Sequence, residues 1–566
     1  MTRSRLSTTD DRAARTTRRS FLAGLAGLGL AGPGTAAGRT DAATTSRSTD
    51  SRPDEGTFTD ANELEAVVDR AIDERIGTTT PGATVAVVTG DDPVLVKGYG
   101  AADVDTGVPV RSDETAFRVG SVGKLVTYTA VMRGVERGVL DLDADVNSYL
   151  GDSAVTVPAT YDDPVTLRHL GTHTAGFESA LDPDVVADPG ALDSLEALLA
   201  GQQPARVRPP GELVGYSNYG AALAGHVVAE VHDTTFEEHV QAEILDPLGM
   251  VHSTFAQPVP SDRPGDLATP HVRDGDSFLT ADDVYINMRP AGSLSATATD
   301  MAAFMRVHLG DGAVGDTRIL GPDAVAAMHS RHHVRHPAVT NWRYGFHEYG
   351  DPEVDLIGHS GATVDFASYL LLAPDADVGI FVAFNSNPSE GPKAVVDEIV
   401  AEYGLQPAPT TPTPTSRAGG RERAETVAGE YGPTYLPRSG PLHVVDLLER
   451  LTVEPAADGR LRTTTIEGDA RRWVETEPYV YEEVGGHDVL AFEVTDGEVD
   501  VLNVSSEPTG VYRPVPFHER RIVAGGVLGT ALSGFGLSLV CRGGHGAWRR
   551  SKRRRTDEGA GTEAAE

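Results

Sequence analysis

The sequence predicts an α+β main domain, in which an antiparallel sheet is flanked by helices and carries a mainly helical insertion. Two hairpin patterns at opposite ends of one segment support this prediction. Near its start, "ATVAVV" and "PVLVKGYGAAD" are typical of strands and are separated by a turn at Gly90-Asp91-Asp92. Near its end, "FASYLLLAP" and "VGIFVAFNS" enclose a second turn at Asp375-Ala376-Asp377. Helical patterns and loops fill the stretch between the two hairpins.

The segments just outside the two hairpins predict the helices that cover the sheet. "ELEAVVDRAIDERI" has apolar residues at helical spacing, and "KAVVDEIVAEYG" is an amphipathic pattern of the same kind. Because a sheet must bury a face against another layer, these helices would pack on a sheet built from both ends of the segment. We therefore expect one layered domain over residues 60–405.

The N-terminal segment predicts an export signal followed by a spacer. Arg18-Arg19 precede "SFLAGLAGLGL", a short and weakly apolar run, and small residues follow near Ala36-Ala37. The pattern over residues 1–38 resembles a twin-arginine signal, which directs folded proteins across a membrane. The alternative is a chance pair of arginines on a disordered leader. Residues 39–59 are rich in Ser, Thr, Asp and Arg, and we expect a flexible spacer there.

The chain of 566 residues is too long for one ordinary domain, and its second half predicts a separate β domain. Residues 406–420, "QPAPTTPTPTSRAGG", form a Pro/Thr linker. Short alternating runs such as "GRLRTTTIEG" and "DVLAFEVTDG" follow, separated by Gly and Asp turns. We expect a small antiparallel all-β domain over residues 421–516, for which a barrel is one arrangement.

A transmembrane helix is predicted over residues 520–541. Within it, Ile522 to Val540 carries no charge, and nineteen residues at about 1.5 Å each span about 28 Å, enough for a hydrocarbon core. The alternative is a buried glycine-rich helix. The tail at 542–566 begins with many arginines, and basic flanks favour the cytoplasmic side. We expect a single-pass protein of the cell membrane, with its main domain outside and its C-terminus in the cytoplasm.

Charge and composition limit the classes of partner and cofactor that the sequence supports. The net charge of −35 argues against nucleic acid, which needs clustered bases. Only four residues are lysine, and such an acidic, lysine-poor surface suggests adaptation to high salt, with ordinary acidic solubility as the alternative. The single Cys541 excludes intramolecular disulfides and a cysteine-based zinc site. "HSRHHVRHP" contains four histidines, His329, His332, His333 and His336, but arginines between them would repel a cation, so a solvated loop is expected and no metal.

One of the four lysines lies three residues after a serine in "FRVGSVGKLVTYTAVM". Residues i and i+3 share a helix face, so a helix beginning at Ser121 would place Lys124 beside its hydroxyl. The apolar run that follows predicts a buried helix, in which the pKa of a lysine falls. A neutral lysine can take the serine proton and make a nucleophile. The alternative is a helix-capping serine and a lysine whose ammonium reaches solvent.

Two further motifs complete an ordered set: Tyr216-Ser217-Asn218 before a helical pattern, and His359-Ser360-Gly361 on a strand. With Ser-x-x-Lys, and with phrases such as "TLRHLGTHTAGF", the chain resembles the serine beta-lactamase and penicillin-binding-protein superfamily over residues 60–405. The branch is that of class C beta-lactamases, D-Ala-D-Ala peptidases and related esterases. The β domain and anchor loosely resemble the tail of membrane-bound relatives.

The resemblance implies a role for each matched position. Ser121 would be the acylated nucleophile, Lys124 its general base, and Tyr216 the group that passes a proton to the leaving group, as a phenolate or as a phenol beside the lysine. Asn218 would donate a hydrogen bond to a substrate carbonyl or to the lysine. The third motif, with His359 and Gly361, would bind substrate, and the backbone N–H groups of Ser121 and Ala362 would form the oxyanion hole. Such donors contribute about 3 kcal/mol each.

The third motif departs from the pattern of efficient beta-lactamases, which usually have lysine where this chain has His359. A fixed ammonium binds a substrate carboxylate, whereas an imidazole is mostly neutral at pH 7. The chain is in this respect more similar to the esterases and peptidases of the branch.

These observations together predict a serine hydrolase that acts outside the membrane on small esters, amides or peptides, without a cofactor. One alternative is a D-Ala-D-Ala carboxypeptidase or a weak beta-lactamase. Another is a catalytically silent surface-binding or sensor protein that keeps the fold.

Overall fold

The computed structural model describes residues 61–520, apart from 91, 180–184, 262, 264, 390, 409–418, 440–448, 457, 466–467 and 469. The export signal predicted at 1–38, the spacer at 39–59 and the basic tail at 542–566 lie outside the described residues. So does all of the predicted span at 520–541 except Arg520. Within the described ranges, no helix has the length and hydropathy needed to cross a bilayer. The predictions for the two ends of the chain stay predictions.

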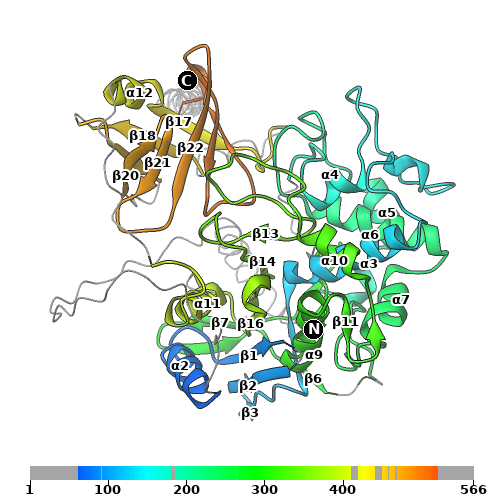
Figure 1. The fold of residues 1–566 in the computed structure, drawn as a ribbon. Coiled ribbons are helices and arrows are strands. Elements are labelled where there is room, and N and C mark those ends of the chain that lie inside the picture. The colour runs from blue at the N-terminus through cyan, green and yellow to red at the C-terminus, as the bar shows by residue number, and fades with distance from the viewer. Residues whose placement is uncertain are drawn as a thin grey trace, which may run out of the picture.

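The main domain is built on a seven-stranded antiparallel sheet, as predicted, in the order β13-β14-β15-β16-β1-β2-β3 (Figure 1). Its centre is the pairing of β1 with β16, in which Ala83 faces Phe384 and Thr89 faces Val378. The two predicted hairpins thus join edge to edge, although they come from opposite ends of the domain. The strands are β1 (Gly82–Thr89), β2 (Asp92–Asp103), β3 (Val108–Pro109), β13 (His347–Glu348), β14 (Ile357–Ala362), β15 (Ala367–Ala373) and β16 (Val378–Phe384).

Alternating residues of the sheet contact different helical layers. Val85 and Val87 of β1 pack with the two terminal helices, α2 (Ala61–Asp73) and α11 (Pro392–Glu402). Their neighbours Ala86 and Val88 belong to the larger core on the opposite face, which α9 (Ala298–Leu309) covers. Both faces are therefore buried, which explains why β1, β15 and β16 are almost continuously apolar.

The region between the hairpins is mainly helical, as predicted, and helices α3 to α7 and α10 lie to the right of the sheet in Figure 1. Its helices are α3 (Gly123–Glu136), α4 (Leu167–Gly171), α5 (Leu195–Gly201), α6 (Asn218–His232), α7 (Phe236–Val240), α8 (Arg289–Gly292) and α10 (Pro322–His329). Short strands join them: β4 (Thr115–Arg118), β5 (Val185–Val186), β6 (Asp266–Leu267), β7 (His271–Asp274), β8 (Ser277–Thr280), β9 (Tyr285–Ile286), β10 (Ser295–Ala296), β11 (Ala313–Val314) and β12 (Thr317–Arg318).

The C-terminal β domain is a closed barrel of eight strands around a core that includes Trp473, Tyr481 and Phe492 (Figure 1). Its strands are β17 (Gly429–Pro433), β18 (Leu451–Pro455), β19 (Leu461–Thr464), β20 (Ala470–Glu477), β21 (Val480–Glu483), β22 (Val489–Thr495), β23 (Glu498–Val504) and β24 (Tyr512–Pro514). Closure removes the exposed edges that an open sheet would carry. A short helix, α12 (Gly420–Thr426), precedes the barrel and was not predicted from the sequence.

Candidate active site

Ser121 lies in a tight turn between strand β4 and helix α3. The turn is a short 3₁₀ segment, Gly120–Val122, and Gly120 has a positive φ of 52°. A Cβ on this glycine would approach the backbone N and O of Ala362 to 2.7 Å. Only glycine fits here, because it tolerates the left-handed conformation and brings the nucleophile turn against strand β14.

Lys124 occupies the first turn of α3 and contacts Ser121 directly. Its Nζ lies 2.8 Å from the Ser121 Oγ and 2.5 Å from the carbonyl oxygen of Ala291. The side chain is fully buried, and burial lowers its pKa well below the ordinary value for lysine. The amine is therefore poised to be neutral and to accept the serine proton.

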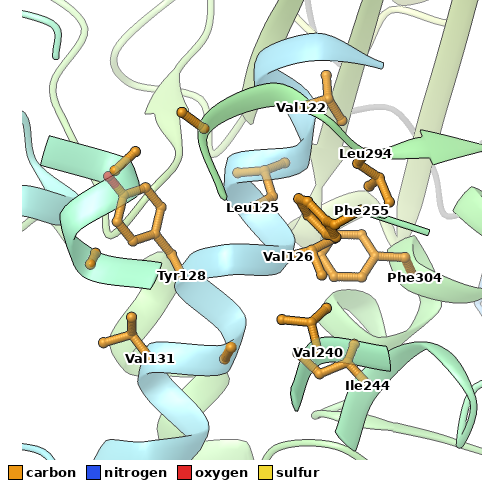
Figure 2. Packing of buried hydrophobic residues seen from close by; sticks show 14 of the residues in the cluster. Val122, Leu125, Val126, Tyr128, Val131, Val240, Ile244, Phe255, Leu294 and Phe304 are labelled. Atoms are coloured by element: carbon orange, nitrogen blue, oxygen red, sulfur yellow. The ribbon is translucent and has the colours of Figure 1, made fainter. Parts of the chain in front are cut away.

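The alternative of a helix-capping serine and a solvent-reaching lysine is wrong. No side-chain cap closes the N-terminus of the 3₁₀ turn or of α3. Lys124 itself is fully buried, and Figure 2 shows Leu125 and Val126 of the same helix in the core that also contains Phe255 and Leu294. All residues of α3 from Gly123 to Met132 are buried.

Tyr216 lies just before helix α6 and faces the lysine. The Lys124 Nζ lies 5.0 Å from the centre of the Tyr216 ring. The phenol oxygen is buried and makes no hydrogen bond of normal geometry to another described residue. Burial raises the pKa of Tyr216, and the Ser121 hydroxyl offsets part of that rise. The resting form is therefore the neutral phenol, which can give a proton, rather than a standing phenolate.

Two aromatic residues that the sequence analysis did not single out pack around this tyrosine. The His173 ring lies 4.3 Å from the Tyr216 ring and 4.6 Å from the Trp342 ring, centre to centre. The backbone N–H of Ser217 donates to His173 Nδ1 at 3.2 Å. His173 was quoted only within "TLRHLGTHTAGF", and its positive φ of 56° is the kind of local strain that marks a functional loop. Nothing local in the sequence pointed to Trp342.

Strand β14 brings the third motif to the nucleophile. A Cβ on Gly361 would lie 2.1 Å from the Val119 carbonyl oxygen, so this strand and the nucleophile turn touch backbone to backbone. The N–H of Thr363 donates to the carbonyl oxygen of Phe366, the residue just before β15, at 2.9 Å. Because N–H directions alternate along a strand, the N–H of Ala362 points away from β15. It therefore faces the open edge beside Gly120, where the predicted oxyanion hole requires it.

His359 is buried beside Tyr216, with ring centres 6.0 Å apart. Its Nδ1 donates to the carbonyl oxygen of Ser360 at 2.5 Å, and its Nε2 has no partner among the described residues. Burial first, then the neighbouring His347 and Lys124, lowers the pKa of His359 well below its ordinary value. The imidazole of His359 therefore stays neutral at lower pH than the imidazole of an exposed histidine would.

Asn218 begins helix α6, and its side chain is exposed. It makes no hydrogen bond to Lys124, whose contacts are Ser121 and Ala291. Of its two expected roles, a bond to the lysine is not present, and the amide is free to meet a substrate.

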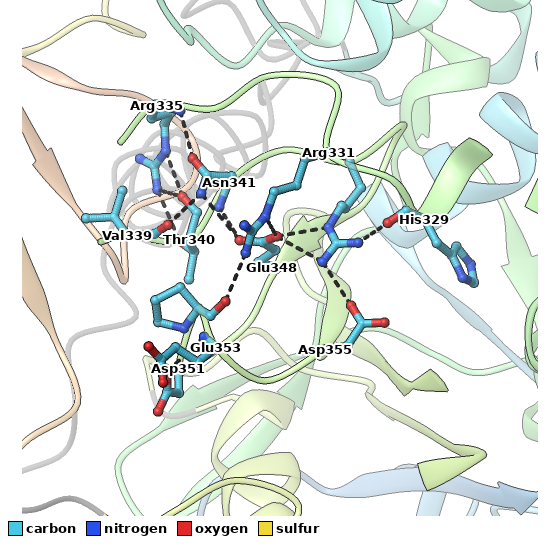
Figure 3. A network of polar contacts seen from close by, with 12 residues as sticks. His329, Arg331, Arg335, Val339, Thr340, Asn341, Glu348, Asp351, Glu353 and Asp355 are labelled. Atoms are coloured by element: carbon cyan, nitrogen blue, oxygen red, sulfur yellow. Dashed lines mark hydrogen bonds and ion pairs between the residues drawn. The ribbon is translucent and has the colours of Figure 1, made fainter. Parts of the chain in front are cut away.

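The solvated loop expected at "HSRHHVRHP" is confirmed only in part, because Ser330, Arg331, Val334 and Pro337 are exposed but the histidines are not. All four histidines of this segment are at least partly buried, and burial lowers the pKa of each, to about 4 for His329 and His333. Figure 3 shows the polar network that surrounds the segment, in which Arg335 and Glu348 are central. Among residues 61–520 as described, no three His, Cys, Asp or Glu side chains are placed to hold a metal ion.

Comparison with known proteins extends these observations. A family model described as "Beta-lactamase" matches residues 68–405. "Penicillin-binding protein 4" of Amycolatopsis lactamdurans is 31% identical over 315 residues, which are 53% of this chain and 79% of that protein. "Protein flp" of Staphylococcus aureus (strain N315) is 23% identical over 56% of this chain, and the match spans 61% of its length.

Two solved structures share the fold. One is the octameric penicillin-binding protein homologue from Pyrococcus abyssi, with a TM-score of 0.52 and 21% identity over 80% of this chain and all of that chain. The other is SurE, with a TM-score of 0.57 and 24% identity over 81% of this chain and all of that chain. Each match covers at least 80% of this chain, which is more than the main domain alone contains. The similarity in fold therefore extends into the barrel.

Proposed function

The chain belongs to the beta-lactamase family and is a serine hydrolase of the beta-lactamase and penicillin-binding-protein type; from this premise we propose that it cleaves small esters, amides or peptides through an acyl-enzyme on Ser121. The observation that carries the proposal is the 2.8 Å contact between Ser121 Oγ and a fully buried Lys124. A buried amine without a carboxylate partner has a physical reason to be neutral and to act as a base.

The proposed reaction begins with Lys124 taking the Ser121 proton as Oγ attacks the substrate carbonyl. The N–H groups of Ser121 and Ala362 stabilise the oxygen anion that forms. The Tyr216 phenol then gives its proton to the leaving oxygen or nitrogen as that bond breaks. The protonated lysine returns a proton to the phenolate, and a water releases the acyl group by the same steps in reverse roles.

The surroundings of the leaving group favour neutral substrates. His359 occupies the position where a fixed cation would bind a substrate carboxylate, and its imidazole is held neutral by burial. We therefore favour esters, amides and blocked peptides over substrates that end in a free carboxylate, such as those of a D-Ala-D-Ala carboxypeptidase.

Covalent labelling tests the nucleophile. A fluorophosphonate probe should add one adduct to Ser121 in the intact protein, and Ser121→Ala should abolish both the adduct and hydrolysis. The exposed Ser148 provides a matched control, because Ser148→Ala should leave both unchanged. Full turnover by Ser121→Ala would refute the proposal, and absence of turnover with any ester or amide would favour a silent binding protein.

A paired substrate panel tests the preference. We expect a higher kcat/KM for D-amino-acid amides and nitrophenyl esters than for peptides that end in D-Ala-D-Ala, measured at several salt concentrations. Equal or better cleavage of the carboxylate-terminated peptides would favour the carboxypeptidase.

We also propose that the enzyme is exported and anchored, on the basis of Arg18-Arg19 and the uncharged run from Ile522 to Val540. Protease treatment of intact cells should degrade the catalytic domain and spare a tag on the basic tail. Protection of the catalytic domain would refute this topology.

A further inference from the structure

The C-terminal barrel contacts the main domain at the catalytic tyrosine. The N–H of Tyr216 donates to the carbonyl oxygen of Thr509 at 2.8 Å. The adjoining residues Gly215 and Gly510 form an isolated antiparallel β-bridge. Thr509 and Gly510 belong to the segment Ser505–Val511, called here the docking loop, which connects the last two strands of the barrel.

Neither bridge residue has room for a side chain, because each glycine is packed against a residue of its own domain. A Cβ on Gly215 would lie 2.1 Å from Nη2 of Arg208. A Cβ on Gly510 would lie 2.8 Å from Cδ1 of Tyr435. Contacts under 3.0 Å force the glycine or its neighbour to move, so either substitution would shift one of the two bridge residues.

Trp342 makes a second connection between the docking loop and the site. Its indole N–H donates to the carbonyl oxygen of Pro508 at 2.7 Å. The same ring packs at 4.6 Å from His173 and at 6.4 Å from Tyr216, centre to centre. The hydrogen bond to the barrel therefore fixes a ring that supports the tyrosine from the side.

Arg335 makes the third connection. Its guanidinium is buried and donates to the carbonyl oxygens of Glu507 at 2.8 Å and Gly510 at 3.0 Å. It also donates to Thr340 of its own segment, as Figure 3 shows, and the Thr340 hydroxyl donates to the carbonyl oxygen of Ser505 at 2.6 Å. A buried charge is costly unless it is fully hydrogen-bonded, so this interface is specific rather than incidental.

We propose that the docking loop is a positioning element of the active site, which holds the Tyr216 phenol beside Lys124 and Ser121. The inference rests on the proposed function. Its physical reason is that the buried phenol oxygen has no hydrogen bond of normal geometry to a described residue, and only the Ser121 hydroxyl interacts with it more loosely. The orientation of the ring therefore depends on its backbone and on the rings beside it, and the docking loop holds both.

The proposal predicts a specific kinetic signature, because Tyr216 serves the leaving group. A nitrophenolate leaves readily without a proton, whereas an amine or a simple alkoxide needs one. A displacement of about 1 Å can cost about 10²-fold in rate. Loosening the docking loop should therefore lower kcat for amides and ethyl esters by about 10- to 100-fold. It should change kcat for nitrophenyl esters much less and leave KM nearly unchanged.

The experiment uses the full chain with three substitutions. Gly510→Ala pushes the bridge residue against Tyr435 and so shifts it from the barrel side. Thr340→Val keeps the side-chain shape but removes the hydroxyl that donates to Ser505 and accepts from Arg335. Gly429→Ala is the matched control in the same barrel, because a Cβ there would meet only Tyr431 at 3.8 Å. Each variant is assayed with a nitrophenyl ester and with the corresponding amide, and its fold is checked by thermal melting.

We expect the ester-to-amide rate ratio to rise in Gly510→Ala and in Thr340→Val, and to stay at the wild-type value in Gly429→Ala. If Gly510→Ala fails to fold, the ester-to-amide rate ratio of Thr340→Val tests the proposal. An unchanged ratio in a folded variant would overturn the proposal, and higher activity on both substrates would show instead that the barrel is an inhibitory cover. Ser121 labelling in wild type, measured alongside, separates these outcomes from a failure of the proposed function.

Discussion

Replacing Lys124 with arginine removes the ability to be neutral while keeping a cation near Ser121. The lysine Nζ lies 2.8 Å from Ser121 Oγ in a site that is wholly buried. Burial lowers the pKa of that amine well below its usual range. A guanidinium in the same place would resist deprotonation, because its charge is delocalised and its ordinary pKa is above about 12.

The molecule itself supplies a scale for the effect. Arg335 is also buried, and burial lowers its pKa only to about 10. At pH 8, an arginine with that pKa would be neutral in about one molecule in a hundred, since each pKa unit is a factor of ten. We therefore expect Lys124→Arg to lower kcat/KM by at least about 10²-fold. The upper limit of the loss is about 10⁴-fold, the largest rate acceleration that a general base usually supplies.

The assay measures the rate of fluorophosphonate labelling of Ser121 and kcat/KM for an ester, both from pH 6 to about 10. The residual activity of Lys124→Arg should still be rising at the alkaline end, whereas the wild type should already have levelled off. Lys97→Arg is the matched control, because Lys97 is partly exposed and pairs with Glu65 and Asp69 at 2.7 Å, so it only needs its charge. Activity of Lys124→Arg within threefold of wild type at neutral pH would refute a neutral lysine base.

Substitutions of Asp365, Gly120 and His359 give three further predictions. Asp365 is buried, and burial and the neighbouring Asp282 raise its pKa from 3.8 to about 6. The folded state therefore holds a proton that the unfolded state releases, so the stability of the wild type falls as pH rises from about 4 to 6. Asp365→Asn should gain up to about 3 kcal/mol at pH 8 and almost nothing at pH 3, and an equal gain in melting temperature at both would contradict this. Gly120→Ala should abolish activity and lower the melting temperature more than Gly249→Ala, since both have positive φ but only the Gly120 Cβ would strike Ala362. His359→Lys should raise kcat/KM for peptides that end in D-Ala-D-Ala relative to amides, and an unchanged ratio would mean that this position does not face the leaving group.

The sequence predicted best what depends on short-range patterns. The spacing of Ser121 and Lys124 holds because a helical turn places such residues together whatever the rest of the fold does. The two hairpins were also readable, because alternation and turn residues are local. That both hairpins share one sheet was expected, because each must bury its apolar faces; their pairing through β1 and β16 came from the structure.

Contacts between distant segments were beyond the sequence. The closeness of Gly120 to Ala362 and the packing of Trp342 on His173 depend on the complete fold. The burial of part of the histidine segment was missed because its charges suggested water, whereas its own Arg335 is buried and donates to a loop far along the chain. The sequence shows the residue types of that segment, but it does not show that the docking loop packs against them.

The bridge between Tyr216 and Thr509 has a consequence for the order of events during synthesis. The nucleophile and its base emerge from the ribosome early, but the loop that steadies the tyrosine is made nearly three hundred residues after it. Domains fold largely as units in the order of their synthesis, and long-range contacts form late. A nascent or truncated chain would therefore hold a folded but poorly active catalytic domain. Hydrolysis of amides would reach its full rate only once the barrel has closed and docked, so that rate would report that synthesis has passed the docking loop.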